Sequence, residues 1–372
     1  TPKGCSDGTG YWGSHSRDFV DYIVVGLGIA GITFCEELEK NNKTFIVYDT
    51  GDVASTKVSA GVINPVVLKR FTPVWNAKEH IETSIKFYKK LAIKLGIPLF
   101  EKMSMLRIFK SIEEQNNWMV ASDKKELETF LKPKIIKNKN LNINAPFGFG
   151  EVNNTGKINP IVLIENYKNY LLKNNQLKNE AFDYNALQVS IDKVFYKDVI
   201  SKKIIFCEGV SAKDNPYFPS KTKISNEPLV IPNKGEYIII NSPELKLYSM
   251  LKTSLFIIPL ANDLYKVGAT YDREDQTVKT TQNAKEEMIH KLKAIINCNF
   301  EVVGQVAGIR PTTRDRRPFL GTLLECENKV FFNGLGTRGI TSAPLLAKSL
   351  YNYIENDLEL PKEMNIKRCY KW

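Results

Sequence analysis

A run of hydrophobic residues near the beginning of the chain gives way to a glycine-rich turn and then to a segment with a different period. Residues 22–25 are continuously apolar or aromatic, which is typical of a buried strand. Residues 29–40 place their hydrophobic side chains at helical spacing. A second apolar run over residues 45–48 ends at Asp49. The pattern therefore predicts strand, turn, helix and second strand in that order.

The rest of the chain continues as helices and strands in two groupings. Helical spacing predicts helices over residues 75–95, 156–173, 283–296 and 342–354. Short apolar runs predict strands over residues 203–207, 237–240, 254–258, 264–267 and 330–332. Residues 55–65 are small and fit neither period, so we expect a loop there. Strand–turn–helix units thus lie at both ends of the chain, with an antiparallel block of strands between them.

This order predicts an α/β fold with two domains, and the length of 372 residues agrees with two domains. The end units predict a discontinuous Rossmann-like dinucleotide-binding domain made of residues 18–95, 150–222 and 304–372. The middle block predicts an inserted antiparallel-sheet domain for the substrate, made of residues 96–149 and 223–303. Residues 1–17 are rich in Gly and Ser without periodicity, and we expect a leader or a disordered extension there.

The three glycines of the first turn have separate expected roles in binding a dinucleotide. Gly26 permits a tight turn, Gly28 has no side chain to hold a pyrophosphate away, and Gly31 lets helix and strand pack closely. Unpaired N–H groups at the helix N-terminus favour a diphosphate. Asp49 accepts hydrogen bonds from ribose hydroxyls and repels a 2′-phosphate, which disfavours NADP. A similar turn can be purely structural, but the complete order of elements favours a bound dinucleotide.

The composition adds information on partners. The net charge is +11, mostly from lysine spread over the chain with asparagine. Such a charge can attract nucleic acid, but the lysines show no stacked aromatic face, so we expect nucleic-acid binding to be unlikely. No apolar stretch is long enough to span a bilayer. The six cysteines have neither zinc-site nor disulfide spacing, and we expect a cytoplasmic protein without a metal site.

Eight stretches in this order resemble the FAD-dependent D-amino-acid oxidase superfamily, and within it the glycine oxidases. They are DYIVVGLGIAG, SAGVINP, GKINP, IIFCEGVSA, EPLVIPNKGE, LFIIP with YKVGATY, AGIRPTTRDRRPFLG, and NGLGTRGITSAPLLAKSL. The resemblance covers the chain from Phe19 to near its end. It implies FAD rather than NAD as the cofactor.

The resemblance also implies which residues contact FAD. The ADP half would lie on Gly26, Gly28, Ile29, Ala30, Gly31, Asp49 and Thr50. The flavin ring would lie along Ser59, Ala60 and Gly61, with further contacts from Gly209 and Gly308. Its pyrimidine end would face Gly336, Arg338, Gly339, Ile340 and Thr341, near a helix that begins about Ser342. N–H groups and a helix dipole there would stabilise the negative charge of the reduced ring.

Two residues are expected to contact the substrate. The resemblance implies that Arg310 pairs with a substrate carboxylate, which a planar guanidinium can do through two hydrogen bonds. We expect Arg310 to follow a strand that ends at Ile309. Phe256 would line the substrate site, where glycine oxidase has a tyrosine, so the carboxylate loses that hydrogen bond. No general base is expected, because His15, His80 and His290 fall outside the flavin-facing stretches and hydride transfer from a neutral amine needs alignment.

The chain also departs from the family pattern. Glu208 replaces a small residue, and the sequence offers no explanation for it. Asp49 replaces the commoner glutamate, and Arg338 is displaced by one position from the family arginine. Residues 309–319 contain no cysteine, so we expect non-covalent FAD.

The sequence thus predicts an FAD-dependent oxidoreductase that takes a hydride from the C–N centre of a small amino acid or secondary amine bearing a carboxylate. One alternative is a flavoenzyme that trims the carboxymethylaminomethyl group of tRNA wobble uridine. Another is a 2-hydroxy-acid dehydrogenase, and a non-catalytic flavin-binding protein is a further class. The electron acceptor, the enantiomer accepted and assembly into a homo-oligomer stay open.

Overall fold

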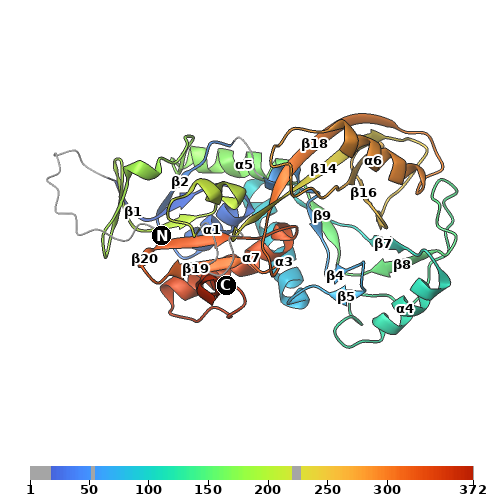
Figure 1. Cartoon of the computed structure of the whole chain (residues 1–372), viewed down its shortest axis with the longest axis horizontal. Coiled ribbons are helices and arrows are strands. Elements are labelled where there is room, and N and C mark those ends of the chain that lie inside the picture. Colours follow the sequence, from blue (N-terminus) through green and yellow to red (C-terminus); the bar gives the residue numbers. More distant parts are fainter. Residues whose placement is uncertain (1–17, 52–54, 220–227, 372) are drawn as a thin grey trace. The chain divides into compact units, whose positions relative to one another are not determined.

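The computed structural model describes residues 18–51, 55–219 and 228–371 (Figure 1). They divide into two compact units. Unit 1 contains the residues up to Lys57, Ile161–Pro232 and those from Arg310 onward, and unit 2 contains Val58–Pro160 and Asn233–Ile309. Residues 58–95, 150–160 and 304–309 therefore lie in unit 2, although the sequence assigned them to the dinucleotide domain. The predicted leader, residues 1–17, lies outside the described residues.

Unit 1 is built on a sheet of eight strands (Figure 1). The parallel strands are β10 (Leu177–Lys178), β2 (Phe45–Tyr48), β1 (Asp18–Val25), β13 (Val199–Phe206) and β20 (Cys326–Asn333), in that spatial order. Antiparallel strands extend the sheet: β12 (Val194–Tyr196) and β11 (Leu187–Val189) beyond β13, and β19 (Phe319–Leu323) beside β20. Strands β1, β2 and β13 are fully buried near their C-terminal ends, as expected for strands covered on both faces.

The helices of unit 1 are α1 (Ile29–Lys40), α5 (Pro160–Lys173) and α7 (Gly339–Glu355), with one turn of helix, α2, at Ser55–Val58. Helices α1 and α7 pack against each other. Three short 3-10 helices are η1 (Tyr184–Ala186), η2 (Gly209–Asp214) and η3 (Ile366–Lys371). The parallel strands with intervening helices form the α/β fold that the sequence predicts.

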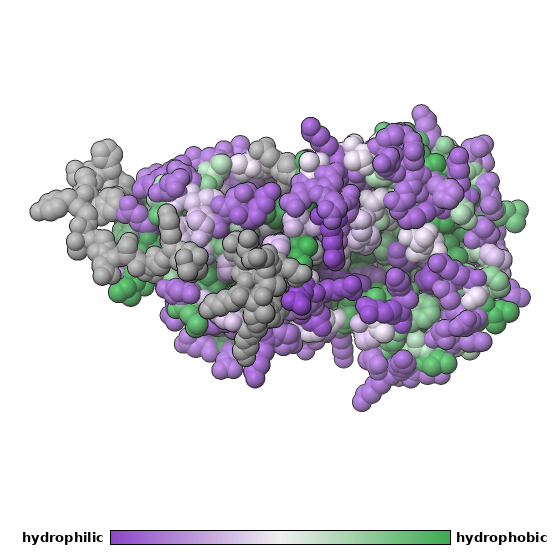
Figure 2. All heavy atoms as spheres, viewed as in Figure 1, coloured by the Kyte–Doolittle hydropathy of each residue, from purple (hydrophilic) through white to green (hydrophobic). Residues whose placement is uncertain are grey.

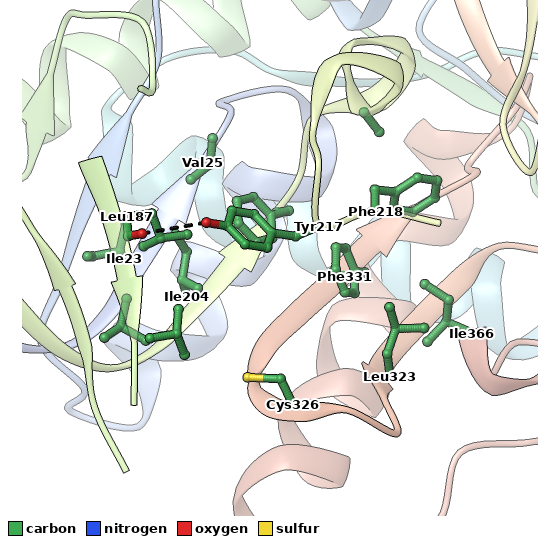
Figure 3. Close-up of a cluster of buried hydrophobic side chains, with 14 of the residues drawn as sticks. Ile23, Val25, Leu187, Ile204, Tyr217, Phe218, Leu323, Cys326, Phe331 and Ile366 are labelled. Atoms are coloured by element: carbon green, nitrogen blue, oxygen red, sulfur yellow. Dashed lines mark hydrogen bonds between the residues drawn. The ribbon is translucent and has the colours of Figure 1, made fainter. Parts of the chain in front are cut away.

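A buried hydrophobic cluster fills one side of the unit 1 sheet (Figure 3). Ile23 and Ile204 come from neighbouring parallel strands, and Phe331 comes from β20 near the other end of the chain. Phe331 stacks on Phe206, with ring centroids 5.5 Å apart. The cluster therefore packs strand β20 of the C-terminal segment against β1 and β13, and this packing stabilises the discontinuous domain.

Unit 2 contains a largely antiparallel sheet of seven strands. Their order is β18 (Glu301–Thr312), β14 (Ile231–Asn241), β17 (Leu264–Gly268), β16 (Phe256–Pro259), β15 (Met250–Lys252), β7 (Met105–Ile108) and β8 (Phe149–Val152). Smaller sheets join β3 (Val62–Ile63), β9 (Gly156–Ile158) and β6 (Phe100–Lys102), and β4 (Val66–Val67) with β5 (Thr72–Pro73). Its helices are α3 (Ala77–Leu95), α4 (Ile112–Ser122) and α6 (Gln282–Lys293).

The two faces of this sheet carry different cores, because successive strand residues point to opposite faces. On one face, Ile257 and Val267 pack with Met288 of α6. On the other face, Met250 and Ile258 join a cluster with Trp118 of α4. Ala60 and Phe256 are partly buried against this second cluster. The second face is therefore the one beside the loop that the sequence assigned to the flavin ring.

Several predicted elements are confirmed and others are corrected. Helix α1 has the predicted bounds, and α3 begins two residues later than predicted. Residues 55–65 are not a plain loop, because they include α2 and β3. Residues 156–158 form β9 rather than the start of a helix. Helix α7 begins at Gly339 rather than Ser342, and α4 was not predicted.

Hydrophilic side chains cover most of the face of the described residues that Figure 2 shows, with hydrophobic ones in scattered patches. Within the part of the chain that the structure describes, every helix is too short or too polar to cross a membrane.

Candidate cofactor and substrate site

Two glycines of the first turn are required by the backbone around them. Gly26 has φ +96°, and a Cβ there would lie 2.6 Å from the carbonyl oxygen of Cys207. A Cβ on Gly31 would lie 2.1 Å from the carbonyl oxygen of Gly26. The tight turn and the close packing predicted for these positions are therefore both present.

Gly28 is a different case, because the protein itself does not require a glycine there. Its φ of −77° and ψ of −169° are extended backbone that any residue can adopt. Among the described residues, a Cβ there would meet only the Thr56 hydroxyl, at an ordinary 3.5 Å. The space beside Gly28 is the kind of gap that a ligand lying on the backbone needs.

The amide groups around this gap have the character of an anion site. The N–H groups of Gly28, Ala30 and Gly31 have no acceptor in the segments that the structure describes. They lie at the positive end of a 12-residue helix. The Ile29 N–H donates to Thr56 Oγ1 at 3.1 Å. These groups fit the diphosphate of a dinucleotide.

Thr56 was not among the predicted site residues. The sequence did contain a signal for it: Thr56 is a hydroxyl residue in a stretch of small residues that begins soon after Asp49.

Asp49 follows β2 and is partly fixed by the turn. Its Oδ1 accepts a hydrogen bond from the Leu27 N–H at 2.9 Å. Its Oδ2 has no donor among the described residues. One carboxylate oxygen is thus held by the protein and the other is available to a hydroxyl group. Thr50 beside it is exposed.

Segments from distant parts of the sequence also meet at the edge of the unit 1 sheet where β1, β13 and β20 end. The buried side chain of Asn333, at the end of β20, donates to the Gly209 carbonyl at 2.8 Å. The Gly336 N–H donates to the Pro311 carbonyl at 2.9 Å. Gly209 and Gly336 both have positive φ. Three stretches that resemble flavin-contacting loops are therefore joined by hydrogen bonds.

The N-termini of α1 and α7 lie side by side. A Cβ on Gly339 would lie 3.2 Å from Ile29 Cγ2. Because α7 begins at Gly339, Ile340 and Thr341 belong to its first turn, and Arg338 is the N-cap residue. The predicted cofactor residues of both chain ends are thus neighbours within unit 1.

The loop of Ser59, Ala60 and Gly61 belongs to unit 2 and is fixed there. Gly61 has φ +66°, and a Cβ on it would lie 2.1 Å from the Ile158 carbonyl oxygen. Gly308 is equally constrained, since its Cβ would lie 2.9 Å from Val58 Cβ. The protein's own packing therefore explains these two glycines.

A lysine holds the start of the same loop. Lys266 Nζ, from β17, donates to the carbonyls of Val58 at 2.6 Å and Ser59 at 2.9 Å. Burial lowers the pKa of Lys266 to about 8. Sequence reasoning missed this residue, although a lysine inside an apolar strand was a visible signal.

The two predicted substrate residues belong to different units. Phe256 begins β16 in unit 2 and is half-buried. Arg310 is half-buried in unit 1, and it does not follow a strand end, because β18 continues through it to Thr312. Their roles stay predictions. His80 and His290 lie within α3 and α6, and His15 falls outside the described residues.

Glu208, which the sequence left unexplained, is bonded inside unit 1. The Tyr184 hydroxyl donates to Oε1, and Asn215 Nδ2 donates to Oε2 at 2.8 Å. Burial raises the pKa of the Glu208 carboxyl to about 7, with the two hydrogen bonds acting in the opposite direction. The carboxyl group thus links the end of β13 to η1 and to the end of η2.

Comparisons with known proteins agree with this arrangement. Residues 21–352 match the model of a family described as FAD dependent oxidoreductase. Glycine oxidase of Bacillus subtilis is 23% identical over 364 residues, which cover 92% of this chain and 94% of that protein. A tRNA 5-methylaminomethyl-2-thiouridine biosynthesis bifunctional protein of Idiomarina loihiensis is 29% identical over 143 residues, 36% of this chain and 23% of that protein.

The fold has counterparts among solved structures. Iminodiacetate oxidase of Chelativorans sp. BNC1 superimposes with a TM-score of 0.77 at 15% identity, over 92% of this chain and 98% of that chain. At this identity the similarity shows the fold.

Proposed function

Since the chain belongs to the family of FAD-dependent oxidoreductases, we propose that it binds FAD non-covalently and oxidises the C–N centre of a small carboxylate-bearing amino acid or secondary amine. The observation that carries the proposal is the anion cradle at Gly28, Ala30 and Gly31. Its amide groups lack acceptors among the described residues, and no packing of those residues requires the gap beside Gly28. The similarity to glycine oxidase over most of both chains supports this class of substrate.

The residues of unit 1 would hold the adenosine diphosphate part of FAD. The N–H groups of the α1 N-terminus would bind the diphosphate, and the open oxygen of Asp49 would accept a ribose hydroxyl. The loop of Ser59, Ala60 and Gly61 would lie along the ring. Residues 309–319 contain no cysteine, which supports non-covalent binding.

FAD, when bound, supplies the acceptor for the hydride and its electron pair. The chain's own residues contribute orientation and charge. The N-terminus of the 17-residue helix α7 provides a partial positive charge, and its Gly339 N–H has no acceptor among the described residues. Such a preorganised site stabilises negative charge that develops during reduction. Arg338, at the N-cap position, adds a full positive charge.

The substrate would be oriented by its carboxylate. The guanidinium of Arg310 can form two parallel hydrogen bonds to it, which fixes direction as well as position. Phe256 would contribute an apolar wall that excludes water. The amine would enter in its neutral form, so that its lone pair assists departure of the hydride without a protein base.

A second candidate is oxidation of a modified tRNA base, which the net charge of +11 and the partial match to tRNA-modifying proteins favour. That match covers less than a quarter of the relative. Salt-sensitive binding of tRNA, or tRNA that copurifies with the protein, would support this candidate. A 2-hydroxy acid could also use Arg310, so the candidates must be separated by substrate.

The test is anaerobic mixing of the purified holoprotein with glycine, sarcosine, proline, D-alanine and 2-hydroxyglutarate, following the flavin absorbance. We expect one or more of the amines to bleach the flavin while 2-hydroxyglutarate does not. Bleaching by 2-hydroxyglutarate alone would overturn the assignment to C–N oxidation. Absence of reduction by every compound would indicate a non-catalytic protein or a larger substrate.

A further inference from the structure

Lys252 lies in a row of side chains across the sheet of unit 2. Strand pairing places it opposite Phe256 on β16 and opposite Arg107 on β7. Residues directly opposite each other in a sheet point to the same face. Phe256 packs against the same hydrophobic cluster as Ala60 of the predicted flavin loop. Lys252 therefore belongs to the face that the proposed function uses.

The ammonium group of Lys252 has an aromatic neighbour and, among the described residues, no counter-ion. Its Nζ lies 4.4 Å from the centroid of the Phe256 ring. Within the segments that the structure describes, no oxygen accepts a hydrogen bond from it. Among the described residues, the charges that act on Lys252 come from Arg107, Lys110 and Lys291, and all three are positive.

Two of these three cations differ from Lys252, because each is paired with a carboxylate. Arg107 is paired with Glu114 at 3.0 Å, and Lys291 with Glu287. Lys266, on the same face as Lys252, is held by two backbone carbonyls. A partly buried positive charge without a partner is costly, and an anionic ligand would remove that cost.

Burial and the three positive neighbours lower the pKa of Lys252 to about 8. The group is therefore mostly protonated at neutral pH and able to bind an anion. The carboxylates nearest to this row, Glu114 and Glu287, are paired with Arg107 and Lys291 rather than with Lys252.

We infer that Lys252 binds a second acidic group of the substrate, so that this chain prefers amines with two acidic groups to amines with one. The inference rests on the proposed function, because it takes Phe256 to line the substrate site. A carboxylate is the simplest second group, and the ligand class is a small dicarboxylic amine.

The experiment compares two amines that differ by one carboxylate. Sarcosine and iminodiacetate share the N-carboxymethyl amine, and iminodiacetate carries a carboxylate where sarcosine carries hydrogen. With the holoprotein, we expect a KM for iminodiacetate at least tenfold below that for sarcosine. Lys252→Met should remove at least tenfold of this preference, Lys252→Arg should keep most of it, and Lys90→Met, at an exposed position of α3, is the matched control.

A binding measurement keeps the inference testable without turnover. Malonate and acetate form a similar pair that cannot be oxidised at a C–N bond. Calorimetry should show tighter binding of malonate than acetate to the holoprotein, and loss of that difference in Lys252→Met but not in Lys90→Met.

Failure of the Lys252 inference and failure of the proposed function would give different results. Reduction of the flavin by both amines with equal KM values, unchanged by Lys252→Met, would overturn the role of Lys252 and leave the proposed function standing. Malonate binding that depends on Lys252, with no amine reducing the flavin, would instead support the anion site and contradict the proposed oxidation.

Discussion

At the scale of single residues, backbone packing requires glycine at positions 26 and 31, whereas the described residues leave space beside Gly28. This difference leads to a prediction. Gly28→Val should lower FAD retention at least 100-fold, because the branched side chain would fill the gap beside the backbone. The unfolding free energy of the apoprotein should change by no more than about 1 kcal/mol. Flavin content and thermal denaturation of the apoprotein check both expectations.

Gly31→Ala is the control for that variant. Its Cβ would lie 2.1 Å from the Gly26 carbonyl oxygen, so the protein itself should lose about 1–3 kcal/mol or more. If Gly28→Val kept its flavin, or destabilised the apoprotein as much as Gly31→Ala does, the gap would not be a cofactor site.

Arg310 carries the second residue-scale prediction. Arg310→Ala should reduce kcat/KM for a carboxylate-bearing amine by roughly 100- to 1000-fold, because loss of a paired charge costs about 2–5 kcal/mol. Most of the loss should be in KM, and flavin content should stay at the wild-type value. Arg310→Lys should recover part of the activity, since it restores charge without the two parallel hydrogen bonds. Unchanged kinetics in Arg310→Ala would show that the carboxylate binds elsewhere.

Glu208 supports a prediction about pH. Its pKa is about 7 in the folded protein against an ordinary 4.5. Between these pH values the folded protein therefore keeps a proton on Glu208 that the unfolded chain releases. The contribution of Glu208 to wild-type stability should therefore fall as pH rises from 4.5 to 7, by at most about 3 kcal/mol. Below pH 4.5 and above pH 7 the contribution is constant.

The matched variant is Glu208→Gln, which cannot ionise and can still bond Tyr184 and Asn215. The difference in unfolding free energy between Glu208→Gln and wild type should shift in favour of the variant across that pH range. A difference that is flat with pH would mean that Glu208 ionises normally in the folded protein.

At the scale of elements, Lys266 connects strand β17 to the loop at Ser59. Lys266→Met should leave the Val58 and Ser59 carbonyls without their donor, at about 1–3 kcal/mol for each buried group. We expect a lower melting temperature, measured by thermal denaturation, and weaker FAD binding, measured by titration of the apoprotein with FAD. Lys266→Arg, which retains donors, should be milder. If Lys266→Met bound FAD as tightly as wild type, the loop at Ser59 would have no role in cofactor binding.

Elements with strong local signals could be predicted from the sequence, and elements set by packing could not. Helix α1 had clear periodicity and a glycine N-cap, and its bounds are confirmed. Helix α4 buries only Trp118, Ala121 and Ser122, while Ile112 and Val120 are exposed, so its hydrophobic pattern is blurred. Helix α7 begins early because Gly339 packs against Ile29, a contact that local sequence does not reveal.

At the scale of the whole molecule, the α/β class and its discontinuous organisation could be predicted, but the bounds between units could not. Residues 58–63 pair through β3 with β9, and β9 pairs with β6. These pairings join positions 54 to 95 residues apart, so they depend on tertiary contacts rather than on local periodicity. The candidate site has the same division: the glycine motif was visible in sequence, whereas Thr56, Lys252 and Lys266 became visible through their contacts.

The most direct measurement for the central claim is the identity of the chromophore released from the purified protein. Denaturation and filtration should give FAD in the filtrate at about one equivalent per chain, with none left on the polypeptide. A colourless protein that takes up no FAD, a released nicotinamide nucleotide, or colour that stays on the denatured chain would contradict it.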